Sequence, residues 1–188
     1  MELIRRTLLG ASTAVGAGLL LLLPLRVTSE ANAANPVPPV LTPFTEQLPT
    51  LGKLGVINAT SGAPKAIEMA NATHSFHVGF TSGTPTFAYK GGDLGTTSQT
   101  LLGPVIVAQK GVPFDLTVTN HLGTHPLRSA IDTGIMGAIP SDTTAPRAAV
   151  HLHGGNTSPG NDGDPMDFFG NGVTKVYHYG NTQEAAGL

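Results

Sequence analysis

The chain has 188 residues, a formal net charge of −2 and 12% charged residues, and it contains neither cysteine nor tryptophan. The lack of cysteine excludes disulfides, thiolate zinc sites, iron–sulfur clusters and His₂Cys blue-copper centres within this chain. The weak negative charge argues against a nucleic-acid-binding protein, which would carry a basic face. Any metal site must therefore use histidine, carboxylate or methionine.

The first 33 residues have the organisation of an export signal. The paired arginines Arg5 and Arg6 precede an uncharged stretch at 8–23, and Ala31-Asn32-Ala33 matches a signal-peptidase cleavage site. Paired arginines favour the twin-arginine route. We expect residues 1–33 to be removed and the protein to be periplasmic or extracellular, with no stable membrane span. An uncleaved membrane anchor is the alternative.

The next segment, 34–72, is predicted to form an irregular arm. It carries five prolines between positions 36 and 49, and proline interrupts helices and central strands. A single helical turn at 67–72 is the regular element expected there.

From Thr73 to the C-terminus the pattern indicates short strands. Phe76, Val78 and Phe80 alternate with small or polar residues, which predicts a strand. Further strands are expected at 87–89, 105–108, 114–119, 148–153 and 174–179, with turns rich in Gly, Pro and Asn between them. A long connection is expected at 121–147. This pattern predicts an all-β fold, an antiparallel sandwich or barrel, over residues 73–188.

The segment His151-Leu152-His153-Gly154-Gly155 is the strongest candidate for chemistry. In a strand, alternate residues point to one face about 6.5–7 Å apart, so both imidazoles can meet one metal or two adjacent metals. Asp162 lies in an acidic turn that can return its carboxylate to the imidazoles, where it would orient a water or relay protons. The alternative is a surface strand with two solvated histidines.

Several motifs occur in a defined order and spacing, at 102–111, 116–120, 151–155, Asp162-Gly163 and 177–188. Together they resemble the first cupredoxin domain of the multicopper oxidases. The leucine between the two histidines and the arm motif Leu41-Thr42-Pro43-Phe44 look like the bilirubin-oxidase and spore-coat-laccase branch. The resemblance implies a cupredoxin-like Greek-key β-sandwich, incomplete at its C-terminal edge, with an irregular N-terminal arm.

The resemblance also implies roles for individual residues. His151 matches a ligand of the type 2 copper, His153 matches a ligand of one type 3 copper, and Asp162 matches an acidic residue that delivers protons to bound oxygen. Copper is the implied cofactor. The complete enzymes couple one-electron oxidation of a phenolic, bilirubin-like or metal-ion substrate to the reduction of O₂ to water.

The sequence departs from the family pattern because it reaches Leu188 before a second His-x-His pair and lacks the later Cys-containing motif. We therefore expect a truncated first domain that contributes part of the copper cluster, is inactive alone and has the remaining cupredoxin domains as partners. Three alternatives stay open: a stand-alone, non-catalytic copper-binding module, an interaction domain without metal, and a single-metal hydrolytic site. The other histidines are expected to have structural roles.

Overall fold

A computed structural model describes residues 39–80, 82–94 and 101–183. The predicted export signal at 1–33 and the last five residues of the family-like C-terminal motif lie outside these ranges. The chain divides into a first unit, Met1–Val40, and a second, compact unit, Leu41–Leu188. Within the described ranges, every helix is too short or too polar to cross a membrane.

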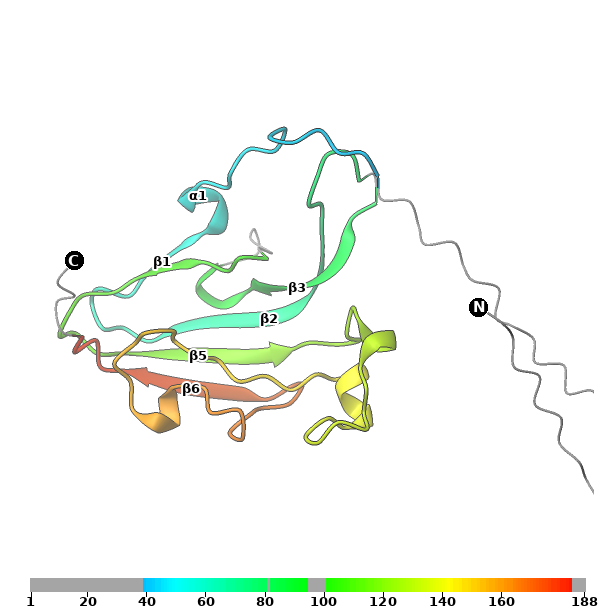
Figure 1. Cartoon of the computed structure of the whole chain (residues 1–188). Helices are drawn as coiled ribbons and strands as arrows, with labels where there is room; N and C mark the ends of the chain where they lie inside the picture. The colour runs from blue at the N-terminus through cyan, green and yellow to red at the C-terminus, as the bar shows by residue number, and fades with distance from the viewer. Residues whose placement is uncertain (1–38, 81, 95–100, 184–188) are drawn as a thin grey trace, which may run out of the picture. The chain divides into compact units, whose positions relative to one another are not determined.

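The regular secondary structure of the second unit is mainly strand, and long irregular segments connect the strands (Figure 1). Among its described residues, the one α-helix has four residues and the other helical segments are single 3₁₀ turns. In chain order the elements are α1 (Leu51–Leu54), β1 (Val56–Asn58), β2 (Lys65–His74), β3 (Thr84–Lys90), η1 (Gly92–Leu94), β4 (Val105–Val107), β5 (Phe114–His121), η2 (Arg128–Ala130), η3 (Pro140–Thr143), η4 (Pro159–Asn161) and β6 (Thr174–Tyr179).

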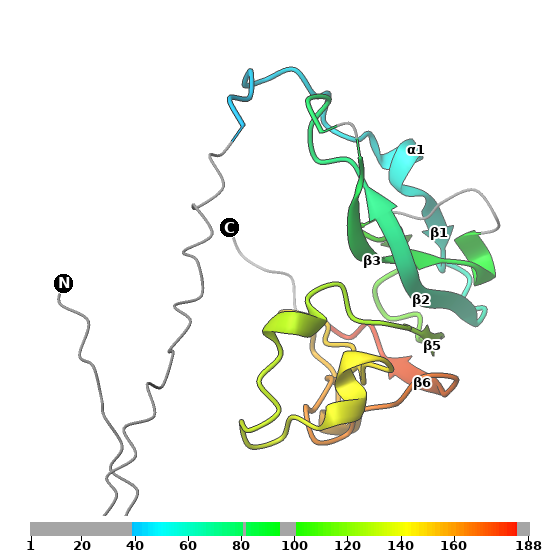
Figure 2. The ribbon, with the colours of Figure 1, turned by 90° about the vertical axis from the view of Figure 1, so that its right-hand side faces the viewer.

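The strands form two sheets, which Figure 2 shows from the side. The larger sheet has the order β3-β2-β5-β6, and the smaller one pairs β1 with β4. The all-β class is confirmed, and two sheets agree with the cupredoxin-like sandwich that the resemblance implies. The expected antiparallel pairing is found between β2 and β3 and between β5 and β6. It is wrong for the other two pairs, because β2 runs parallel to β5 and β1 runs parallel to β4.

Strand β2 corrects the predicted arm. Residues 65–74 form a central strand where the sequence predicted a helical turn at 67–72 and an arm extending to residue 72. This segment has no proline, and its pairing with both β3 and β5 overrides the helix preference of its Ala, Glu and Met residues. The folded sheets therefore begin at Val56, upstream of the predicted boundary at Thr73.

Two predicted strands are absent from the described structure. Residues 75–80 form bends and a turn, with Phe76 and Val78 largely exposed, so the alternation there does not correspond to a sheet face. Residues 149–153 are irregular, and Ala148 makes only one isolated bridge, to Phe169. The strands predicted at 87–89, 105–108, 114–119 and 174–179 are confirmed, with small shifts of their ends.

The core lies between the two sheets. Alternate residues of β5 point inward, and Val118 and Tyr177 are fully buried. Ile57 of β1 belongs to the same apolar cluster, and Ile106 of β4 packs against it. Burial of these side chains is the main source of stability for a sandwich of this kind.

The connection at 121–147 is confirmed as a long irregular segment with two 3₁₀ turns. Arg147, at the end of this segment, links it to itself. Its guanidinium donates two hydrogen bonds of 2.7 Å to the Asp142 carboxylate and one to the Gly137 carbonyl. This hydrogen-bonded pair holds the pKa of Asp142 below its usual value.

Candidate metal centre

The segment that carries His151 and His153 is held in place by its neighbours rather than by a sheet. Ala148 and Phe169 exchange two backbone hydrogen bonds, at 3.0 and 2.9 Å. The Val150 N–H donates to the Tyr177 hydroxyl at 2.9 Å. These contacts fix the position of the backbone at Ala148 and Val150, immediately before His151.

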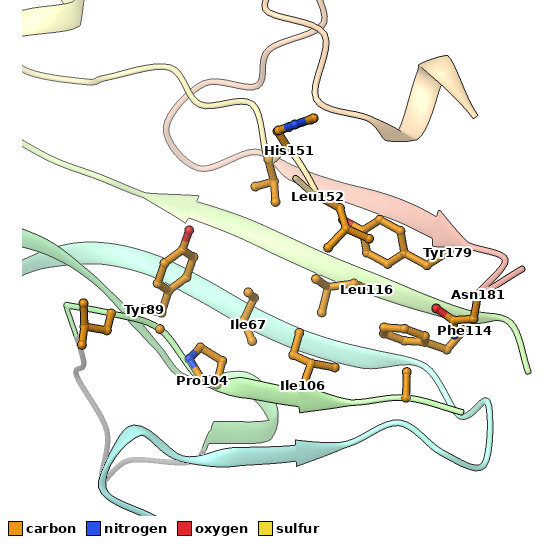
Figure 3. Close-up of a pocket in the computed structure, with 14 residues that line it drawn as sticks. Ile67, Tyr89, Pro104, Ile106, Phe114, Leu116, His151, Leu152, Tyr179 and Asn181 are labelled. Atoms are coloured by element: carbon orange, nitrogen blue, oxygen red, sulfur yellow. The ribbon is translucent and has the colours of Figure 1, made fainter. Parts of the chain in front are cut away.

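The side chains of Leu152 and His151 point in different directions. Leu152 lies beside Tyr179 in an apolar pocket of about 300 Å³ between the sheets, whereas the His151 ring points away from it (Figure 3). The leucine thus contacts the pocket with part of its side chain, although it is 41% exposed, and the histidine ring points outward. The side chain of His151 is 52% exposed.

The two histidines lie next to each other although their segment is not a strand. Their ring centroids are 5.8 Å apart, and the ring planes differ by 37°. The predicted clustering is therefore observed, but the strand geometry from which it was predicted is wrong. Two adjacent imidazoles can bind one metal or serve two neighbouring metals.

Asp162 reaches His151 with both its backbone and its side chain. The Nδ1 atom of His151 lies 2.6 Å from the Asp162 carbonyl oxygen and 3.1 Å from its Oδ1. A carbonyl oxygen can only accept, so Nδ1 must carry the hydrogen, which leaves the Nε2 lone pair free. Metal-binding histidines commonly donate their second N–H in this way, which fixes the tautomer and the ring orientation.

A glycine allows the turn containing Asp162 to approach this closely. Gly163 has φ +75°, and a Cβ there would lie 2.5 Å from the Val150 carbonyl oxygen and 2.8 Å from the His151 Cα. A side chain at this position would therefore separate the turn from the histidine segment.

The donor set fits copper in part. Imidazole suits Cu(II), and divalent affinities peak at copper in the Irving–Williams order. A polar pocket of about 420 Å³ lies beside His151 and Asp162. Among residues 39–80, 82–94 and 101–183, no group of three or more His, Cys, Asp or Glu side chains is arranged to hold a metal. His151 and His153 thus fit as two ligands of a site that needs further donors.

Other histidines contact protein groups. His77 Nε2 lies 2.9 Å from the Thr42 carbonyl oxygen, and His178 Nδ1 lies 2.6 Å from Asp115 Oδ1. The second pair was not foreseen, although it follows from the direct pairing of β5 and β6. Thr157, which donates to Asp162, was also missed, and its only sequence signal is its place in the same turn.

Comparison with known proteins gives a consistent set of relatives. The chain is 36% identical over 161 residues to "Multicopper oxidase LPR1 homolog 5" of Oryza sativa subsp. japonica, which covers 79% of this chain and 24% of that protein. It is 33% identical over 159 residues to "Multicopper oxidase LPR2" of Arabidopsis thaliana, which covers 77% and 26%. The chain thus spans about a quarter of the length of these relatives. No protein-family model matches it.

A multicopper oxidase from Campylobacter jejuni, described as a metallo-oxidase, is a similar solved structure. The match has a TM-score of 0.40 and 15% identity, and it covers 77% of this chain and 26% of that one. This overlap is loose, so the relationship rests on the sequence matches.

Proposed function

The chain is a relative of the multicopper oxidases, and from that premise we propose that it supplies two histidine ligands, His151 and His153, to the copper centre of such an enzyme. The observation that carries the proposal is the hydrogen bond from His151 Nδ1 to Asp162. This bond leaves the Nε2 lone pair of His151 available to bind a metal. The His151 side chain is 52% exposed, and the centroid of the His153 ring lies 5.8 Å from that of the His151 ring.

Each residue has a separate part in the proposal. His151 would bind the type 2 copper and His153 one type 3 copper. Asp162 would keep His151 in its metal-binding tautomer and hold a proton near the centre. Bound copper would supply one-electron chemistry.

The activity belongs to the complete protein. The chain spans about a quarter of its relatives, so oxidation of a phenolic or metal-ion substrate and reduction of O₂ to water are proposed for the whole enzyme. The remaining ligands would come from further cupredoxin domains. Export by the twin-arginine route is part of the proposal, and N-terminal sequencing of the exported protein should begin at Ala34.

A second candidate function is that of a non-catalytic copper-binding module. The exposure of His151 supports it, because copper can reach this residue without a second domain. It differs from the first in requiring exogenous ligands, such as water, to complete the coordination of the metal.

Copper titration of the purified chain tests both. Isothermal titration with Cu(II) and electron paramagnetic resonance should detect copper bound through nitrogen ligands. Substituting both His151→Ala and His153→Ala should weaken binding at least tenfold, since two of the donors are lost. The matched control is His178→Ala, which removes an imidazole that is also paired with a carboxylate. Unchanged copper affinity in the double variant would reject both functions.

Adding the remaining domains separates the two candidates. A longer protein that contains the further cupredoxin domains should oxidise a phenolic substrate and consume O₂, and should lose both activities in the double variant. Retention of copper without oxidase activity in that longer protein would favour the non-catalytic module.

A further inference from the structure

We propose that Thr157 is a positioning residue for the candidate metal centre, because its hydroxyl orients the Asp162 carboxylate toward His151. The inference rests on the proposed function in so far as it concerns copper. Its geometric part, the effect of Thr157 on His151, can be measured in the metal-free protein.

One carboxylate oxygen of Asp162 lies between two donors. The Thr157 Oγ1 donates to Asp162 Oδ1 at 2.9 Å, and the same Oδ1 lies 3.1 Å from His151 Nδ1. Three side chains therefore form a chain of polar contacts that ends at a proposed ligand. The threonine is β-branched, so its χ1 is restricted and its hydroxyl has a defined direction.

Without the threonine, little else would hold that oxygen near the histidine. The Asp162 side chain is 43% exposed, so its carboxylate can rotate toward water. The Asp162 carbonyl would still accept from His151 Nδ1, and the tautomer would be kept. What would be lost is the contact between the carboxylate and Nδ1, which holds the orientation of the imidazole ring.

Independent contacts fix the backbone of the turn. The Asn161 Oδ1 accepts from the backbone N–H of His178 on β6 at 2.8 Å. Gly163 lies against Val150 and His151 on the other side. Because these contacts do not involve Thr157, Thr157→Val should keep the turn in place and remove only the hydroxyl.

The expected effect on copper is moderate. Loss of a residue that directly supports a metal ligand costs about 10- to 100-fold in metal affinity. Thr157 acts through Asp162, one contact farther from the metal, so we expect Thr157→Val to weaken Cu(II) binding about 3- to 10-fold.

The experiment combines three variants of the full chain with two readouts. Thr157→Val removes the hydroxyl, Thr157→Ser restores it, and Thr60→Val is the matched control, since Thr60 also donates to a side-chain oxygen in a turn. The readouts are the ¹⁵N chemical shifts of the His151 imidazole without metal and the dissociation constant for Cu(II). Thr157→Val should change both, whereas Thr157→Ser and Thr60→Val should resemble the wild type.

Repeating the Thr157→Val substitution in an Asp162→Ala variant tests whether Thr157 acts on His151 through Asp162. If Thr157 acts through Asp162, Thr157→Val should have no further effect on His151 or on copper in that background. Unchanged His151 shifts in the single variant, or an equal effect with and without Asp162, would overturn the inference. If the wild type binds no copper but the His151 shifts still respond to Thr157→Val, the proposed function fails and the positioning role stands.

Discussion

The Tyr177 hydroxyl accepts a hydrogen bond from the backbone N–H of Val150 at 2.9 Å. Tyr177 lies on β6 and is fully buried, whereas Val150 directly precedes the candidate metal ligand His151. The hydrogen bond to Tyr177 of the sheet therefore holds the irregular segment that carries His151 and His153 in place. The start of this segment is thus anchored to the sheet although residues 149–153 form no strand.

Removing this hydroxyl should destabilise the domain. Tyr177→Phe leaves the partly buried Val150 N–H without its acceptor, which costs about 1–2 kcal/mol of the free energy of unfolding. Urea denaturation measures this cost. Tyr179→Phe, which removes the hydroxyl of the stacked neighbour at 6.3 Å, is the control. Equal stability of the two variants near neutral pH would show that the contact with Val150 contributes nothing.

Gly163 should be essential for the approach of Asp162 to His151. Gly163→Ala places a Cβ about 2.5 Å from the Val150 carbonyl oxygen, so the turn must move away and copper affinity should fall. Gly172→Ala is the matched control, because Gly172 has φ +76° and open space around its Cα. Both variants carry the strain of a left-handed alanine, about 1 kcal/mol. Only Gly163→Ala should also weaken copper binding, and equal copper affinities would contradict the role of close approach.

Asn120 should be a main determinant of stability at the end of β5. Its side chain is fully buried, donates to the carbonyls of Pro146 and Phe169, and accepts from the N–H of Leu122. Asn120→Ala removes the partner of the Pro146 carbonyl and of the Leu122 N–H, and leaves the Phe169 carbonyl with only the Ala148 N–H. This should cost about 2–4 kcal/mol in chemical denaturation. Asn71→Ala, at an exposed asparagine with two similar backbone contacts, should cost about 1 kcal/mol or less. A smaller loss for Asn120→Ala than for Asn71→Ala would contradict this ranking.

The strands that could be predicted are those whose two faces have different environments. In β5, alternate residues are buried, so the sequence and the structure show the same period. Strand β2 could not be predicted, because its residues include good helix formers and its conformation is imposed by pairing with β3 and β5. The alternation at 76–80 has the appropriate period, but no strand in the described part of the chain pairs with it.

The proximity of the candidate residues could be predicted in part, but the local geometry could not. His151 lies beside both His153 and Asp162, but a strand does not align the histidines. Their positions depend on contacts between residues far apart in the sequence, such as Val150 with Tyr177 and Ala148 with Phe169. Such contacts leave no local period for a sequence pattern to reveal.

Stability at alkaline pH should depend on Tyr179. Burial, together with the neighbouring Tyr177, raises the pKa of Tyr179 to about 12 from an ordinary value of 10. Below pH 10 the phenol is neutral in both states, so its contribution to stability is complete. Above pH 10 the unfolded chain loses its proton first, so the free energy of unfolding falls as the pH rises toward 12. The loss should reach about 2–3 kcal/mol at pH 12.

Urea denaturation between pH 9 and pH 12 measures this loss. Tyr179→Phe has no proton to lose at this position, so its free energy of unfolding should fall less steeply with pH than that of the wild type. Absorbance at 295 nm should show one tyrosine ionising near pH 12 in the folded wild type and not in the variant. Parallel stability curves for the two proteins would contradict the raised pKa, because the phenol would then ionise alike in the folded and unfolded chains.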